Sequence, residues 1–331
     1  MSLLASSPPA PADALRVDFR DAPLADALAD PQLLAAFGFG TAAPAIHDDA
    51  RYLRVALPAF GRAPLECWRV DDAVTHGRDG DLAWSEGGGL QFGALEIADD
   101  GDIETAAAAG YMRLQRWLAD SDHPHPLRIW NYLDAITEGE DDAERYRRFC
   151  VGRARGIGRT LAPGELPAAT AIGHPARSGR FQLYWLSARR PGTPLENPRQ
   201  VQAWRYPRQY GPQAPGFARA LLPASEAMPL LLSGTAAVVG HASQHGDSLD
   251  AQFEEVLANL RSLIATARAQ RSGLPAQPGA ASHLKVYARD ADALPRIDAL
   301  MEALLPGVPR IVLHGHVCRR ELLVEIDGTH S

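Results

Sequence analysis

The sequence has few cysteines and no long apolar runs. Its three cysteines, Cys67, Cys150 and Cys318, are scattered and form no CxxC pair, which argues against a disulfide framework or a zinc ribbon and suits a reducing cytoplasm. No apolar run approaches the roughly 18 residues of a membrane span, and the N-terminus lacks the basic and apolar regions of a signal peptide. We therefore expect a cytoplasmic protein that has no membrane as a partner.

The sequence also lacks an excess of positive charge and the common nucleotide and nucleophile motifs. It has 33 basic and 40 acidic residues, a net charge of −7, so we expect no nucleic-acid partner, and an anionic ligand would need a local arginine pocket. The run Gly87-Gly88-Gly89 has no lysine–serine pair and precedes a strand, which indicates a tight turn rather than a phosphate loop. No GxSxG segment supports a serine nucleophile.

Two pairs of histidines could in principle bind zinc. His241 and His245 are four residues apart, and His314 and His316 alternate along one predicted strand. The first pair lies in a strand-to-helix loop without a helical HExxH frame. We interpret all four as hydrogen-bonding histidines and predict no metal site, with zinc as the less favoured alternative.

At 331 residues the chain is long enough for two domains, and each half is predicted to contain the order β-β-β-α-β-α-β-β. We expect an irregular segment over 1–35, an N-terminal domain over 36–190 and a C-terminal domain over 191–331. Asp102 and either Asp247 or Ser248 are predicted helix caps. Strands are predicted at 52–57, 66–70, 90–97, 127–133, 168–173 and 180–188 in the first half, and at 200–206, 217–222, 229–240 and 284–289 in the second. This repetition predicts a duplicated α+β unit.

The last strands, 309–328, are predicted to form a β-hairpin. Alternation would place Arg310, His314, His316 and Cys318 on one face of its first strand. On the return strand, Glu325 is an acid within the apolar run Leu-Leu-Val-Glu-Ile. Such an acid is costly to bury unless it is partnered or protonated, so we expect Glu325 to have a chemical role.

Three other stretches are candidate pocket walls. Small residues around Gly234 and Thr235 would let the backbone approach a ligand, although tight packing alone would also explain them. The aromatic and arginine-rich stretches around Tyr206 and Arg219 suit a planar anion, with a rigid loop as the alternative. Arg148 lies in an arginine-rich helix that could equally be a solvated face.

The second half resembles the Rid/YjgF family. The resemblance rests on an SGTA strand end at 233–236, a helix at 252–264, KVYARD at 285–290, and Pro-Arg followed by a terminal VEI strand. In that family an arginine holds the substrate carboxylate and a glutamate works beside it, which implies these roles for Arg310 and Glu325. The first half has Leu-Tyr-Trp at 183–185 in the corresponding strand, so it is expected to be mainly architectural.

From about Ala35 to the end, the chain resembles the chorismatases more closely. The stretches that carry this likeness are RIWNYLDAITEGE, ERYRRFCVGR, the YGP and FARA segments, SGTAAVVGHASQHG and HVCRRELLVEIDG. The hydroxybenzoate-forming enzymes are the nearest in type, including the bifunctional xanthomonad type that makes both 3- and 4-hydroxybenzoate. The resemblance implies an α+β fold of two Rid/YjgF-like units of chorismate mutase-like topology, with mixed sheets and helices packed on one face.

The resemblance also implies a reaction. Glu325 would protonate the enolpyruvyl methylene of chorismate, and a ring hydroxyl would then displace the pyruvate oxygen through an arene oxide, giving 3-hydroxybenzoate and pyruvate without a cofactor or metal. A cysteine at position 318 is typical of this branch, whereas the hydrolytic branch, which yields a dihydroxycyclohexadiene carboxylate, tends to have alanine. A Rid-type enamine/imine hydrolase and a metabolite-binding module remain alternatives.

The substrate-binding residues are less tightly implied than the acid. Chorismate has two carboxylates, for which Arg310 is the first candidate and Arg219 or Arg148 the second. Tyr206 would hydrogen-bond the substrate, and Gly234 and Thr235 would line the floor. Rid proteins form trimers with sites between subunits, and a duplicated chain would replace one such interface internally, so we expect a monomer rather than a trimer.

Overall fold

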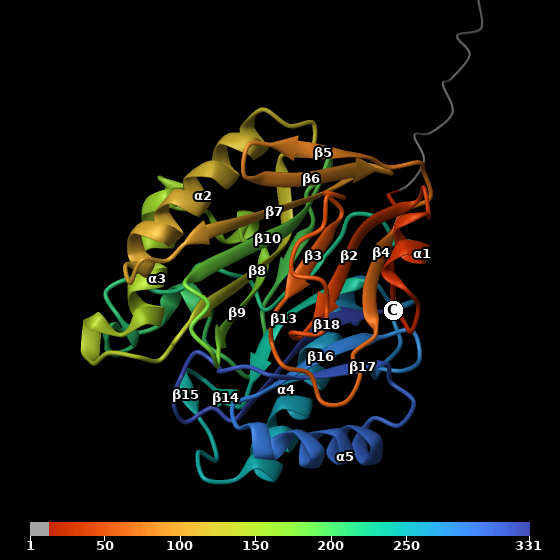
Figure 1. Cartoon of the computed structure of the whole chain (residues 1–331). Helices are drawn as coiled ribbons and strands as arrows, with labels where there is room; N and C mark the ends of the chain where they lie inside the picture. Colours follow the sequence, from red (N-terminus) through yellow and green to blue (C-terminus); the bar gives the residue numbers. More distant parts are fainter. Residues whose placement is uncertain (1–12) are drawn as a thin grey trace, which may run out of the picture.

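A computed structural model of the chain describes residues 13–331 and shows a mixed α+β protein with three principal sheets (Figure 1). The first sheet has four strands in the order β1-β4-β2-β3. Its elements are β1 (Arg16–Arg20), α1 (Leu24–Leu28), β2 (Leu33–Phe39), β3 (Tyr52–Val55) and β4 (Leu65–Arg69).

The second sheet has six strands in the order β5-β6-β7-β10-β8-β9 and belongs to the first α+β unit. Its first helix begins at the predicted cap, where Asp102 Oδ1 accepts a hydrogen bond from the Thr105 backbone N–H at 3.3 Å. The elements are β5 (Thr75–Asp79), β6 (Leu82–Gly87), β7 (Leu90–Ala98), α2 (Ile103–Ala119), β8 (His125–Asp134), α3 (Arg145–Ile157), β9 (Ala168–His174) and β10 (Arg180–Ala188).

The third sheet has six strands in the order β11-β12-β13-β18-β16-β17 and belongs to the second unit. Ser248, one of the two predicted caps, accepts a hydrogen bond from the Ala251 N–H at 3.3 Å. The elements are β11 (Thr193–Leu195), β12 (Ala220–Leu222), β13 (Leu230–Ala236), the small ribbon β14 (Val238–Val239) and β15 (Ala242–Ser243), α4 (Leu249–Gln270), β16 (His283–Ala288), α5 (Leu294–Leu304), β17 (Arg310–His314) and β18 (Val324–His330).

The two six-stranded sheets have the same topology. In each, three antiparallel strands are followed by a helix, a strand, a second helix and two further strands, and the sixth strand is inserted between the third and the fourth. In each, the two strands joined through the second helix are parallel, as in β8–β9 and β16–β17. The predicted α+β class, with two related units and helices on one face of mixed sheets, is confirmed.

The beginning of the first unit differs from the prediction. Strands predicted at 52–57 and 66–70 as its first two correspond to β3 and β4, which belong to the separate four-stranded sheet. The unit instead begins at β5, whose sequence Thr-His-Gly-Arg-Asp is exposed and has no apolar alternation to reveal a strand. Residues 13–35, predicted to be irregular, contain β1, α1 and the start of β2. The first 12 residues of that predicted segment lie outside the described residues.

The predicted C-terminal hairpin is wrong. Both β17 and β18 exist, but β16 lies between them, parallel to β17 and antiparallel to β18. An irregular segment, residues 315–323, carries the chain across β16. His316 and Cys318 therefore lie beyond the end of β17, and alternation along that strand does not place them on the face of Arg310.

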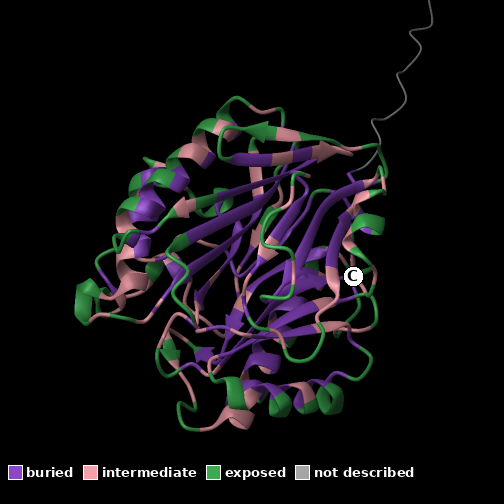
Figure 2. Ribbon diagram, viewed as in Figure 1, coloured by how far each residue is buried: buried purple, intermediate pink, exposed green. Residues whose placement is uncertain are grey.

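Buried side chains form three main cores (Figure 2). One lies between the sheet of the first unit and its helices α2 and α3, and another lies between the sheet of the second unit and its helices α4 and α5. The third is central and aromatic, and it draws on all three sheets, with Phe37 and Trp68, then Trp130 and Tyr184, then Tyr287. The four-stranded sheet thus covers a side of the centre that the two units leave open, with β2 against β6 and β7 and β1 against β16.

Within residues 13–331, no helix is both long and apolar enough to cross a membrane.

Candidate active site

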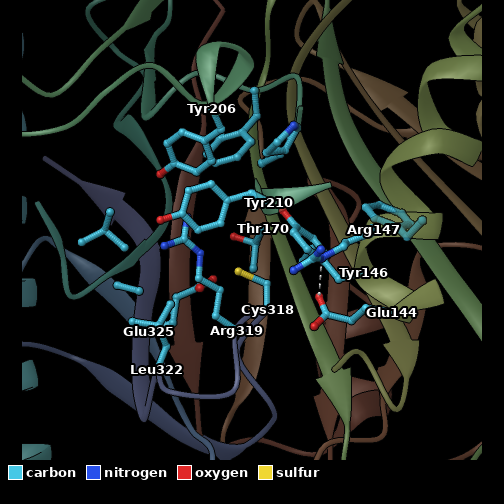
Figure 3. A pocket seen from close by; sticks show the side chains of 18 of the residues that line it. Glu144, Tyr146, Arg147, Thr170, Tyr206, Tyr210, Cys318, Arg319, Leu322 and Glu325 are labelled. Atoms are coloured by element: carbon cyan, nitrogen blue, oxygen red, sulfur yellow. Dashed lines mark ion pairs between the residues drawn. The ribbon is translucent and has the colours of Figure 1, made fainter. Parts of the chain in front are cut away.

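A cavity of about 380 Å³ lies where the two units meet. β9 and the inner face of α3 form its wall from the first unit, and β13, β18 and residues 318–322 form its wall from the second. Backbone hydrogen bonds between Gly173 and His316, at 2.7 and 2.8 Å, join the units beside it. Figure 3 shows Cys318 and Glu325 below Tyr206 and Tyr210 across this space. The lining residues used below are Tyr146, Arg153, Thr170, Tyr206, Tyr210, Arg219, Gly234, Cys318, Arg319 and Glu325.

Glu325 is the acid of the site. It is the second residue of β18, its side chain faces the cavity, and only 5% of the residue is exposed. Among the described residues, no side chain or backbone group donates a hydrogen bond to its carboxyl that would favour the ionised form. Burial, reinforced by the charge of Asp327 and opposed by Arg128 and Arg219, raises its pKa to about 8. A carboxyl of this kind is protonated near neutral pH and faces a cavity to which it can deliver the proton.

Gly234 provides the space that Glu325 occupies. A Cβ placed on this glycine would lie 2.0 Å from Glu325 Oε1 and 3.4 Å from Thr170 Oγ1. The close approach coincides with an irregularity in the β13–β18 pairing between Leu232 and Thr235. The predicted contribution of Gly234 to the cavity floor therefore has a physical cause, which is the absence of a side chain beside the acid.

Cys318 lies in the irregular segment before β18 and lines the cavity beside Glu325. It is half-buried and free. Burial, followed by the negative charge that Glu325 would carry, raises the pKa of its thiol to about 12. At neutral pH the group is therefore a neutral thiol, which can donate a weak hydrogen bond or fill space but does not supply a thiolate nucleophile.

Five arginines line the cavity, and two of them, Arg147 and Arg320, pair with Glu144 and Glu140. The other three, Arg153, Arg219 and Arg319, form no ion pair with a carboxylate of residues 13–331. Instead, Arg153 donates to the Gly216 carbonyl at 2.6 Å, and Arg219 donates to the Tyr206 hydroxyl at 2.7 Å. Arginines that are held by neutral acceptors keep their charge available for an anionic ligand.

Two tyrosines hold Arg219 and Arg319 in place. The Arg319 guanidinium lies 4.0 Å from the ring centre of Tyr210 and 5.2 Å from that of Tyr206. Arg219 lies 5.5 Å from the Tyr206 ring centre as well. Cation–π contacts of this kind fix the guanidinium planes and leave N–H groups for a carboxylate. The predicted roles of Tyr206 and Arg219 thus fall within one cluster at the cavity.

The structure corrects three of the predicted binding residues. Arg310 is not among the cavity residues, because its guanidinium pairs with Asp298 at 2.7 Å and Glu302 at 3.1 Å on α5. Arg148 points to α2, where it pairs with Asp102 at 2.7 Å.

Thr235, next to the cavity-lining Gly234, is absent from the lining, and its hydroxyl donates to the Ser233 carbonyl at 3.0 Å. Successive strand residues point to opposite faces, so the floor contains Gly234 but not Thr235.

Several lining residues were not predicted. Arg153 could have been found, because Tyr146, Phe149 and Arg153 recur at helical spacing on the buried face of α3. Thr170 and Arg319 gave no such signal, since one lies in an ordinary apolar strand and the other in a pair of arginines, Arg319-Arg320.

One histidine of each pair makes a hydrogen-bond contact in the structure. Within residues 13–331, no group of three or more His, Cys, Asp or Glu side chains is arranged to hold a metal ion. His241 Nδ1 shares a hydrogen bond with the Tyr210 hydroxyl at 3.1 Å, and His314 Nε2 lies 3.1 Å from the Arg289 carbonyl. Both contacts fit the predicted hydrogen-bonding roles.

Comparison with known proteins shows the family to which the chain belongs. Residues 66–187 match the family described as chorismatase FkbO/Hyg5-like, N-terminal. A 3-hydroxybenzoate synthase of Streptomyces hygroscopicus is 34% identical over 274 residues, which cover 80% of each protein. The chain belongs to the chorismatase family.

Other chorismatases support the same assignment. A chorismatase of Streptomyces rapamycinicus is 35% identical over 274 residues, which cover 80% of this chain and 81% of the relative. A crystal structure of a chorismatase superposes with a TM-score of 0.84 at 31% identity, over 97% of this chain and 99% of that one. The whole architecture, including the four-stranded sheet, is therefore that of a chorismatase.

Proposed function

We propose that this chorismatase converts chorismate to 3-hydroxybenzoate and pyruvate, with Glu325 as the general acid. The observation that carries the proposal is a buried carboxyl, its pKa raised to about 8 by burial, that faces the same cavity as three arginines without carboxylate partners among residues 13–331. The matching relative named 3-hydroxybenzoate synthase supports this product.

The first step is proton transfer from Glu325 to the terminal methylene of the enolpyruvyl ether, which gives an oxocarbenium ion and leaves the glutamate ionised. General acid catalysis of this kind is typically worth roughly 10²–10⁴ in rate. Two of the three cavity arginines that have no carboxylate partner among residues 13–331 would hold the carboxylates of chorismate. A carboxylate on Arg219 would also neutralise a charge that favours ionised Glu325, so binding itself would help the acid to keep its proton.

The second step decides the product. A ring hydroxyl displaces the pyruvate oxygen, and the arene oxide opens and loses a ring proton to give the aromatic acid. Glu325 recovers a proton in this sequence, and 3-hydroxybenzoate and pyruvate together contain all the atoms of chorismate, so no water is consumed. The half-buried, neutral thiol of Cys318 beside the acid suits a site that directs the oxocarbenium ion toward the ring hydroxyl rather than toward water.

Incubation with chorismate tests the proposal. Equal amounts of pyruvate and 3-hydroxybenzoate are expected, and chromatography would show whether 4-hydroxybenzoate forms as well. Pyruvate with the non-aromatic diol would instead identify the hydrolytic branch. Tight binding without turnover would favour a metabolite-binding module, and turnover of imines alone would favour a Rid-type hydrolase.

The Glu325→Gln variant tests the role of the acid. It keeps the shape of the side chain without its proton, and pyruvate release should fall by at least 10²-fold. Glu302→Gln is the matched control, because that carboxylate pairs with Arg310 on the outer side of α5. A fully active Glu325→Gln variant would show that another group donates the proton.

We also propose that the chain is a monomer, because the four-stranded sheet already covers the third side of the central core. Light scattering coupled to size-exclusion chromatography would measure this directly. The cytoplasmic location remains a prediction from the sequence; the three cysteines are free in the structure.

A further inference from the structure

Behind Glu325 lies a second carboxylate that the proposed reaction does not use. Asp327 has no solvent exposure, and one of its oxygens, Oδ2, accepts four hydrogen bonds. The donors come from both units and are Thr170 Oγ1 at 2.8 Å, Trp130 Nε1 at 3.0 Å, the Tyr287 hydroxyl at 3.1 Å and the Arg128 guanidinium at 3.2 Å. Four donors on a single oxygen suit an ionised carboxylate, which has only acceptors to offer.

The charges around Asp327 are balanced. Arg128 and Lys285, the only lysine of the chain, are both buried, and they face two carboxylates, Asp327 and Glu66. Lys285 Nζ lies 2.8 Å from Glu66 and 3.9 Å from Asp327 Oδ1. Buried charges are tolerated when they are paired and hydrogen-bonded. A third carboxylate, if ionised, would have no cation left in this cluster.

Glu325 is that third carboxyl. It lies two residues before Asp327 on β18, so both side chains project from the same face, about 6.6 Å apart along the strand. Thr170 connects the two positions, because its hydroxyl donates to Asp327 and also lies beside the Gly234 backbone that Glu325 contacts. The remaining titratable or charged neighbours of Glu325 are Arg128 on β8, Tyr146 on α3, Arg219, Tyr287 on β16 and Cys318.

We propose that Asp327 is a positioning residue whose fixed negative charge keeps the proton on Glu325 until the substrate takes it. The inference rests on the proposed function for its catalytic meaning, but the effect on the proton does not require turnover. Asp327 contributes to the raised pKa of Glu325, second only to burial, whereas Arg128 and Arg219 act in the opposite direction. The four donors on Oδ2 hold the Asp327 carboxylate in place behind Glu325.

The test measures the protonation of Glu325 in an Asp327→Asn variant. Infrared spectroscopy would record the bands of neutral carboxyl groups as the pH is raised. The band of Glu325 is identified by its loss in Glu325→Gln. In Asp327→Asn the midpoint should fall by roughly one to two pH units, as expected for a unit charge at this distance in a protein interior. If the variant turns over chorismate, the alkaline limb of its pH–rate profile should fall by the same amount, while the rate on the acidic side stays within a few-fold.

Glu66→Gln is the matched control, because it removes the other buried carboxylate of the cluster on the far side of Lys285. It should destabilise the fold without an equal shift of the Glu325 midpoint. Equal shifts in both variants would show a general effect of lost buried charge and would overturn the proposal.

If Asp327→Asn does not fold, a comparison of the parent protein with Glu325→Gln still tests whether the proton lies on Glu325. At neutral pH one neutral carboxyl band of the parent protein should be lost in Glu325→Gln, whereas Glu196, whose pKa burial raises to about 7, contributes a band of its own that stays. Identical spectra of the two proteins would place the proton on a carboxyl other than Glu325 and overturn the proposal. Because the spectrum needs no substrate, failure to form hydroxybenzoate would count against the proposed function alone.

Discussion

The carboxyl of Glu325 lies so close to the backbone of Gly234 that a methyl group there would be 2.0 Å from Oε1. Real Cβ contacts are never this short, so one of the two groups would have to move. Gly234 does not have a positive φ, and its requirement is therefore steric. The absence of a side chain at Gly234 on β13 thus determines where the Glu325 carboxyl on the neighbouring strand β18 can lie.

Gly234→Ala should therefore displace Glu325 and slow the reaction. We expect a loss of roughly 10²-fold in kcat, which is the typical cost of moving a catalytic group by about 1 Å, and a loss of about 1–3 kcal/mol in the free energy of unfolding from overpacking. Steady-state kinetics and urea unfolding would measure the two effects. Gly273→Ala is the control, because nothing lies within 4 Å of a Cβ at that position. Unchanged kcat in Gly234→Ala would show that the acid does not depend on this contact.

The raised pKa of Glu325 predicts a cost in stability that depends on pH. Between its ordinary pKa of 4.5 and the folded value of about 8, the folded protein holds a proton that the unfolded chain has lost. The free energy of unfolding therefore falls as the pH rises through this window. Glu325→Gln does not titrate, so its stability relative to the parent protein should increase from pH 4.5 to 8 and then level off. Urea unfolding at pH 5, 7 and 9 would measure the difference, and a constant difference would contradict the raised pKa.

The sequence predicted the acid better than its surroundings. Glu325 was identified because burying one ionisable side chain within an apolar strand costs free energy, and the local sequence alone shows such a residue. Gly234 was predicted for its lack of a side chain, and the structure adds the reason.

The arginines were harder to predict, because the sequence does not show which carboxylates will neutralise them. Arg310 and Arg148 are ordinary candidates until α5 supplies Asp298 and α2 supplies Asp102. Arg219 and Arg319 remain without carboxylate partners among the described residues, because their guanidinium groups contact aromatic rings, hydroxyl groups and backbone carbonyl groups instead. The prediction of a C-terminal hairpin was wrong for a similar reason, since the insertion of β16 between β17 and β18 is a long-range property of the sheet.

The thiol of Cys318 should direct products without acting as a nucleophile. With its pKa near 12, it should react with iodoacetamide far more slowly at pH 7.5 than an ordinary exposed cysteine does. Cys318→Ala should retain pyruvate release but shift the second product toward the non-aromatic diol, because the smaller side chain leaves room for water. Chromatography of the products measures the ratio, and Cys150→Ala serves as the control for loss of a buried thiol. An unchanged ratio in Cys318→Ala would exclude the cysteine from this role.

Arg219 and Arg310 offer a direct comparison between a cavity arginine and one that pairs with carboxylates elsewhere. Arg219→Gln removes a guanidinium that has no carboxylate partner among residues 13–331 and lies beside Tyr206 in the cavity. KM for chorismate should rise about 10–100-fold, since a hydrogen bond to a charged group is worth about 1.5–3 kcal/mol. Arg310→Gln should leave KM unchanged and cost at most about 1 kcal/mol of stability, because it breaks only partly exposed ion pairs. Kinetics across a chorismate series would separate the two variants. A higher KM in Arg310→Gln alone would restore the sequence-based choice of Arg310 as the substrate's partner.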